Sequence, residues 1–128
     1  MKISTDCYCF ELPERWKDLV GVRKKGRYTD LYLLWEEDSG LSGLLVRLKC
    51  LKRKMSSPDD YTEYICAVGT PDGDERFLYA SYGREGCVSE ENEDLYWRLR
   101  DQLWKVFESI CPTQEGKTAC GKERMKDA

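Results

Sequence analysis

The chain has 128 residues, of which 41% are hydrophobic and 35% are charged, and its formal net charge is −3. This length suits one domain with a single core, and the composition excludes a disordered chain and a membrane-embedded one. The excess of acidic residues argues against general affinity for nucleic acid or anionic lipid, so we expect neither nucleic acid nor a membrane among the partners.

Two kinds of feature are missing from the sequence. There is no histidine, which excludes Ser-His-Asp and Cys-His catalysis as well as histidine-ligated zinc. No segment approaches the roughly 20 apolar residues of a membrane span, and residues 1–6 lack the apolar stretch of a secretory signal. We therefore expect a cytoplasmic protein, and we identify no catalytic residue and no cofactor.

Six segments have the alternating or continuously apolar pattern that is typical of β-strands. They are 7–12, 19–25, 28–36, 42–50, 61–69 and 76–82. The segment 28–36 is apolar on both sides, which predicts a position in the sheet interior. Turn residues and polar residues separate the segments, so a meander of mostly antiparallel strands is expected.

A short helical turn is predicted directly after the first strand. Pro13 lacks the N–H group that a strand needs, but it suits the first position of a helix. The turn covers 14–18 and carries Trp16.

The segment 89–110 has the periodicity of a long amphipathic helix. Its apolar residues recur every three or four positions and therefore lie on one face. We expect Ser89 or a neighbour to cap the helix, and Pro112 to end it. The apolar stripe consists of Leu95, Leu99, Leu103, Val106 and Ile110.

Together these elements predict an α+β fold. An antiparallel sheet of about six strands is expected to carry the long C-terminal helix on one face, with the short helical turn after the first strand. Residues 1–112 would form the single domain. Residues 113–128 are polar and lack periodicity, which predicts a flexible tail.

One motif resembles a known group of proteins. Residues 10–17 read F-E-L-P-E-R-W-K, which resembles the F-x-L-P-x-x-W-K start of a family of small bacterial domains. The likeness extends over 7–110 and, more remotely, to the PsbP-like fold. This resemblance implies a sheet packed against helices and an accessory binding role, and it supplies no catalytic residues.

Seven cysteines are many for this length. Packed or surface thiols in a reducing compartment explain them most simply. The pair Cys7 and Cys9 could begin a zinc site with Cys111 or Cys120, but residues two apart on a strand point to opposite faces. We therefore predict no metal site, and a thiolate metal or redox protein remains the second alternative function.

A basic run extends from Arg47 to Lys54, with Tyr61 and Tyr64 nearby in the sequence. Such residues can bind phosphate or single-stranded RNA. Because the net charge is negative and no RNA-binding motif is present, a solvated strand edge and loop is the preferred interpretation.

Trp97 and Trp104 lie close together on the predicted helix, away from its apolar stripe, with Arg100 beside them. Either another segment covers these tryptophans, with Arg100 stacked nearby, or they form an exposed patch. An exposed patch of this composition is typical of protein–protein interfaces.

The leading functional hypothesis is a non-enzymatic interaction or accessory module, with a protein partner or a second copy of the chain. It would use Trp97, Arg100 and Trp104, or the opposite face of the sheet. The alternative is a small-ligand or enzymatic site in a groove between sheet and helix. We expect that groove to be lined by Tyr61, Tyr64, Tyr79 and Tyr82, with Arg47 or Lys49.

Overall fold

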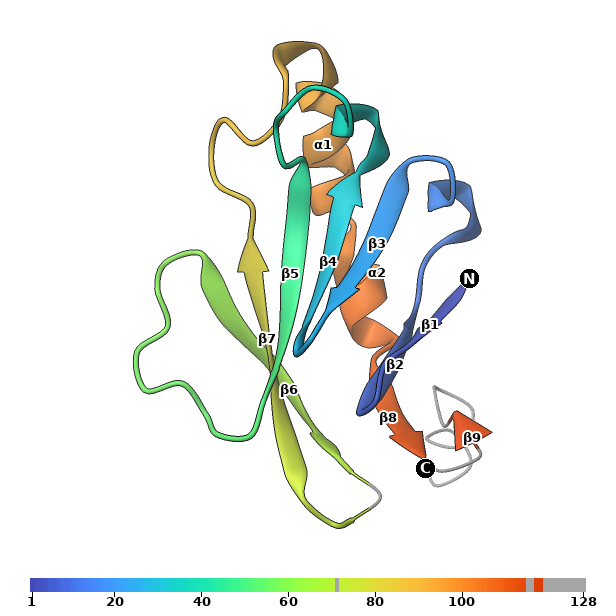
Figure 1. Ribbon diagram of the computed structural model, residues 1–128, viewed down its shortest axis with the longest axis vertical. Coiled ribbons are helices and arrows are strands. Elements are labelled where there is room, and N and C mark those ends of the chain that lie inside the picture. Colours follow the sequence, from blue (N-terminus) through green and yellow to red (C-terminus); the bar gives the residue numbers. More distant parts are fainter. Residues whose placement is uncertain (71, 115–116, 119–128) are drawn as a thin grey trace.

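Figure 1 shows the computed structural model of the chain, which describes residues 1–70, 72–114 and 117–118. Two antiparallel sheets and a helical segment near the C-terminal end make up an α+β fold, as predicted. Among these residues, no helix is long and apolar enough to cross a membrane.

The larger sheet contains five of the six predicted strands. They are β3 (Val20–Lys25), β4 (Tyr28–Leu33), β5 (Leu44–Leu51), β6 (Thr62–Gly69) and β7 (Glu75–Tyr82). Their spatial order is β3-β4-β5-β7-β6, and every neighbouring pair is antiparallel. The meander therefore holds up to β5, after which β7 inserts between β5 and β6.

The strand β4 lies in the sheet interior, as its sequence predicted, but it is shorter than expected. It ends at Leu33, and Leu34–Glu36 form the 3-10 helix η2. Trp35 consequently leaves the sheet and is 59% exposed.

The first predicted strand belongs to a second sheet, which corrects the prediction of one sheet with about six strands. This strand is β2 (Tyr8–Glu11), which pairs with β1 (Lys2–Ser4) and with β8 (Cys111–Gln114). The strand β9 (Lys117–Thr118) pairs in turn with β8. The expected tail 113–128 therefore begins inside a strand, and its residues 115–116 and 119–128 lie outside the described part of the chain.

Pro13 explains why β2 does not continue into the larger sheet. It interrupts the strand ladder, and the predicted helical turn follows as the 3-10 helix η1 (Glu14–Trp16), with Trp16 buried. The two strands that pair with β2, namely β1 and β8, are too short to show the alternating pattern that identifies a strand in a sequence.

The predicted long helix is interrupted. It consists of the 3-10 helix η3 (Glu90–Asn92), α1 (Glu93–Arg100) and α2 (Leu103–Glu108). Between α1 and α2, the Gln102 N–H donates to the Leu99 carbonyl at 3.0 Å, which is the tighter three-residue spacing of a 3-10 turn. Because Gln102 has φ −101° and ψ 4°, the α-helix cannot continue through it.

The helical segment packs its predicted apolar stripe into the core. Leu95 is half-buried, and the other four residues of the stripe are buried: Leu99, Leu103, Val106 and Ile110. They share this core with one face of the larger sheet, which contributes Leu31, Val46, Leu48, Leu78 and Ala80. In the part of the chain that the structure describes, no helix covers the other face of this sheet (Figure 1), which we call the open face.

Candidate functional site

Two rows of side chains cross the open face. Residues that pair across antiparallel strands point to the same side of a sheet, so the strand register assigns each row. The first row is Arg23, Asp30, Arg47, Ser81 and Thr62, and the second is Lys25, Tyr28, Lys49, Tyr79 and Tyr64. Basic side chains therefore recur in both rows beside tyrosines and hydroxyl groups.

Arg47 lies on the middle strand of this face and is held by Asp30. Its Nε and Nη2 atoms donate to the two carboxylate oxygens at 2.7 and 3.0 Å, which is the bidentate geometry that arginine favours. These hydrogen bonds raise the pKa of Arg47 above its ordinary value. The Asp30 side chain is only 6% exposed and that of Arg47 is 40% exposed, so the pair presents its cation outward.

Two tyrosines of the second row reach the solvent. Tyr28 is 38% exposed and Tyr64 is 45% exposed. The Tyr28 ring centre lies 5.3 Å from the Arg47 guanidinium carbon and 5.8 Å from Lys49 Nζ. Lys54 Nζ, from the loop after β5, lies 5.7 Å from the Tyr64 ring centre. These distances fall within the range of cation–π contacts, so each exposed ring already has a basic neighbour.

A groove of about 340 Å³ opens at one end of this face, beside the end of β7. Three basic residues line it, namely Arg47, Lys49 and Arg84. Thr62 and Ser81 also line it, and their hydroxyl groups share a hydrogen bond of 2.7 Å. Basic and hydroxyl side chains of this kind can bind a carboxylate or a phosphate.

Arg84 is the basic residue of the groove that sequence reasoning missed. Its guanidinium carbon lies 4.2 Å from the ring centre of Tyr61, and its Nη2 atom lies 3.5 Å from an Asp59 carboxylate oxygen. Hydrogen bonds from Thr62 and from the Tyr61 backbone lower the pKa of Asp59, and Arg84 adds to this effect. Arg84 follows β7 in an irregular segment, so no strand pattern pointed to it.

The structure brings together only part of the predicted tyrosine groove, because two of its four tyrosines line it. Tyr61 and Tyr82 line the groove beside Arg47 and Lys49. Tyr64 and Tyr79 lie elsewhere on the open face, where their rings pack edge to face at 5.4 Å. Tyr79 is buried beneath the loop after β5, and its hydroxyl accepts a hydrogen bond from the Met55 N–H at 2.9 Å.

Tyr82 lines the groove, but its side chain packs against the core side of the sheet. Its hydroxyl donates to the Glu63 carboxylate. Burial and this neighbouring carboxylate raise the pKa of Tyr82 well above its ordinary value. The phenol therefore stays protonated at neutral pH and acts as a hydrogen-bond donor.

The helical segment exposes both tryptophans that the sequence singled out. Trp97 is 42% exposed and Trp104 is 54% exposed, so no segment in the described part of the chain buries them, which corrects the interpretation that they are covered there. Arg100 donates to the Gly83 carbonyl at 2.8 Å and to the Tyr96 hydroxyl at 3.0 Å. Its guanidinium carbon also lies 4.7 Å from the Trp97 ring centre. Arg100 therefore joins the helix to the sheet and supports one of the two tryptophans.

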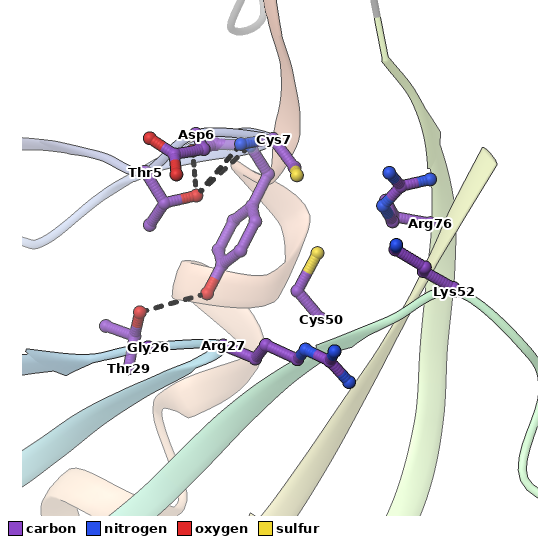
Figure 2. Close-up of a pocket in the computed structure, with 10 residues that line it drawn as sticks. Thr5, Asp6, Cys7, Gly26, Arg27, Thr29, Cys50, Lys52 and Arg76 are labelled. Atoms are coloured by element: carbon purple, nitrogen blue, oxygen red, sulfur yellow. Dashed lines mark hydrogen bonds between the residues drawn. The ribbon is translucent and has the colours of Figure 1, made fainter. Parts of the chain in front are cut away.

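A second cavity, of about 130 Å³, lies at the other end of β5, between the two sheets (Figure 2). Cys7 and Cys50 line it together with three basic residues, namely Arg27, Lys52 and Arg76. Burial, and next the neighbouring Cys7 thiol, raise the pKa of the Cys50 thiol to about 12. We call this cavity the thiol pocket.

The cysteines do not gather as the zinc hypothesis required. Cys7 faces Cys50, whereas the Cys9 sulfur lies 3.5 Å from that of Cys111, its partner across β2 and β8. Within residues 1–70, 72–114 and 117–118, no group of three or more histidine, cysteine or acidic side chains is placed to hold a metal ion. Cys120 lies outside these residues.

Comparison with known proteins adds no relative. No protein-family model, no curated protein and no solved structure matches this chain. The resemblance to the F-x-L-P-x-x-W-K domains and to the PsbP-like fold therefore stays a prediction.

Proposed function

We propose that the protein is a non-enzymatic cytosolic binding module whose open face takes an acidic segment of a partner protein. The observation that carries this proposal is the pair of side-chain rows on a sheet face that no described helix covers. A sheet face with basic and aromatic side chains has the residue types that dominate protein interfaces.

Charge complementarity supports an acidic partner. The open face and its groove carry six basic residues: Arg23, Lys25, Arg47, Lys49, Lys54 and Arg84. Beside the rows and the groove, Asp30 and Asp59 are each already paired with an arginine, and Glu75 lies at the far end of β7. The chain as a whole has a net charge of −3, so positive charge is concentrated on this face.

The surroundings of the tyrosine rings favour a protein over single-stranded nucleic acid. A base that stacks needs a free ring face, whereas Tyr28 and Tyr64 have basic neighbours beside their rings. A carboxylate needs only the N–H groups of those neighbours. An extended acidic segment can therefore use the side chains as they lie.

Binding of a short fluorescent peptide rich in glutamate and tyrosine tests the proposal. We expect fluorescence anisotropy to show binding that weakens as salt rises, because the contacts are between exposed charges. Lys49→Glu should weaken binding by about tenfold or more, since it replaces attraction with repulsion in the middle of the face.

Lys17→Glu is the matched control, because it makes the same charge change at an exposed residue outside both rows. Equal loss of binding in the two variants would show that only the total charge matters, and would contradict the proposal. Tighter binding of single-stranded DNA than of the peptide would contradict it as well.

The groove supports a second candidate function, the binding of a small anionic ligand. Arg47, Lys49 and Arg84 converge there with the hydroxyl groups of Thr62 and Ser81. A ligand-detected magnetic resonance experiment with inorganic phosphate and with citrate tests this function. If it is correct, Arg84→Gln should abolish ligand binding while leaving most of the peptide affinity, because Arg84 lies at the end of the open face.

A further inference from the structure

We propose that the thiol pocket is a site of thiol–disulfide exchange with an anionic low-molecular-weight disulfide of the glutathione class. Cys7 and Cys50 are the reacting thiols, and Arg27, Lys52 and Arg76 attract the carboxylates of the disulfide. The site lies on the core side of β5, so it is separate from the open face and from its groove.

The geometry brings two sulfur atoms from different sheets to one cavity. Cys7 immediately precedes β2, whereas Cys50 is near the end of β5 and pairs with the buried Leu78. In Figure 2 both sulfur atoms point into the space that the lining residues enclose. Both side chains are half-exposed and line the same cavity, so an attacking reagent can reach either thiol there.

The cavity is lined by three basic residues and one acidic residue, Asp6, so its lining favours an anion. Arg76 and Lys52 lie beside the Cys50 sulfur in Figure 2, and Arg27 approaches from the turn between β3 and β4. None of these three forms an ion pair with a carboxylate in the described part of the chain. The cavity of about 130 Å³ is large enough to admit an end group such as a carboxylate.

The two thiols have different roles. Burial and the contact with Cys7 raise the pKa of Cys50, so this thiol keeps its proton at neutral pH and is not the first to attack. Attack therefore falls to Cys7, which lines the same cavity. Cys50 acts in the second step, when the neighbouring sulfur has become part of a disulfide.

The exchange is balanced in two steps. The Cys7 thiolate attacks one sulfur of the added disulfide, forms a mixed disulfide, and releases one small thiolate. Cys50 then loses its proton to water or to that thiolate, attacks the Cys7 sulfur, and releases the second small thiolate. The two protein thiols are oxidised to one Cys7–Cys50 disulfide, and the added disulfide is reduced to two thiols.

Intact-mass spectrometry of the full-length reduced protein with oxidised glutathione tests the proposal. We expect a transient glutathione adduct on Cys7, followed by a protein two mass units lighter in which peptide mapping links Cys7 to Cys50. Cys50→Ser should accumulate the adduct, because its resolving thiol is gone. Cys7→Ser should remove both products.

The role of charge is tested with a neutral reagent, bis(2-hydroxyethyl) disulfide. Arg76→Gln combined with Lys52→Gln should slow the reaction with oxidised glutathione by about tenfold and leave the rate with the neutral disulfide unchanged. Cys87→Ser is the matched control, since Cys87 is also half-buried but lies far from the pocket in the groove.

Two results would overturn the proposal. One is an adduct that forms at Cys87 or Cys66 as fast as at Cys7, because the pocket would then give no selectivity. The other is an equal effect of the charge variant on both disulfides, which would show that the basic residues only maintain the local structure. Far-ultraviolet circular dichroism of each variant confirms that it is folded before rates are compared.

Discussion

Glu36 shows how a single buried carboxylate can join two distant segments. The side chain is 1% exposed and accepts hydrogen bonds from the Ser89 N–H and the Ser89 hydroxyl, the latter at 2.9 Å. Burial alone would raise the pKa of Glu36, but hydrogen bonds from Ser89, Ser39 and Asn92 outweigh it and lower this pKa. Ser89, which we expected to cap the helix, therefore donates a hydrogen bond from its hydroxyl to Glu36 of η2.

The lowered pKa predicts how stability depends on pH. Because the pKa of Glu36 is lower in the folded chain than in the unfolded one, its contribution is present above the unfolded value and is lost as pH falls through the folded value. We expect Glu36→Gln to lower the free energy of unfolding by about 2 kcal/mol at pH 7. Urea denaturation of both proteins should show this difference shrinking below about pH 4; a difference that is constant from pH 7 to pH 3 would contradict it.

Gly83 is required by close packing at the end of β7. A Cβ atom at this position would overlap the Leu44 carbonyl oxygen and would lie 2.7 Å from the Tyr96 hydroxyl oxygen. We expect Gly83→Ala to cost about 2 to 3 kcal/mol. Gly69→Ala is the control, because nothing lies within 4 Å of its added Cβ atom, and thermal denaturation should show little change there.

At the scale of elements, the interruption between α1 and α2 shapes the surface of the helical segment. Both helices keep the predicted apolar stripe in the core, while Gln102 in the interruption accepts a hydrogen bond from Arg15 of η1. The helical segment is thereby linked to η1 as well as to the two sheets. Its outer side remains exposed at Trp97 and Trp104.

Two adjacent residues of α2 differ in their surroundings, because Leu103 lies in the core and Trp104 lies on the surface. Leu103 is 1% exposed, so Leu103→Ala should lower the free energy of unfolding by about 3 kcal/mol through the cavity that it leaves. Trp104 is 54% exposed, and Trp104→Ala should change stability by less than about 0.5 kcal/mol. Chemical denaturation of the two variants checks this order; a large loss for Trp104→Ala would mean that this side chain is covered in solution.

At the scale of the whole molecule, an acidic protein carries a basic sheet face. Asp30 reduces the positive charge of that face, because its carboxylate is paired with Arg47. We expect Asp30→Asn to tighten the binding of the acidic peptide and to lower the free energy of unfolding by about 1 to 2 kcal/mol, since a charge-assisted pair is lost. Anisotropy and urea denaturation measure the two effects, and weaker peptide binding by the variant would contradict the proposed role of the face.

Patterns within single segments predicted most of the helices and strands. Which residues meet in the site depends instead on how the strands pair. The stripe from Leu99 to Ile110 identified the buried face of the helix because periodicity depends only on neighbours in the sequence. Which tyrosines meet depends on register, and β7 inserts between β5 and β6 so that Tyr79 pairs with both Lys49 and Tyr64. A register shift near Tyr64 and the irregular segment with Arg84 cannot be read from one strand alone.

The smaller sheet was not predictable for a related reason. Its strand β8 contains Pro112, which marks the end of the helix in the sequence and gives no sign of a strand. The thiol pocket depends on that sheet, because Cys7 reaches Cys50 only where β2 lies against the larger sheet. Neither thiol has a sequence pattern that names the other as its neighbour.

The pairing of β2 with β8 has a consequence for how the chain reaches its structure during synthesis. Cys9 and Cys111 lie next to each other but are 102 positions apart in the sequence. A ribosome therefore releases β2 long before its partner is made, and the closing contact has a high entropic cost. Until then one edge of β2 and the cavity beside Cys7 stay open to other chains, so we expect the nascent protein to be most prone to aggregation just before β8 emerges.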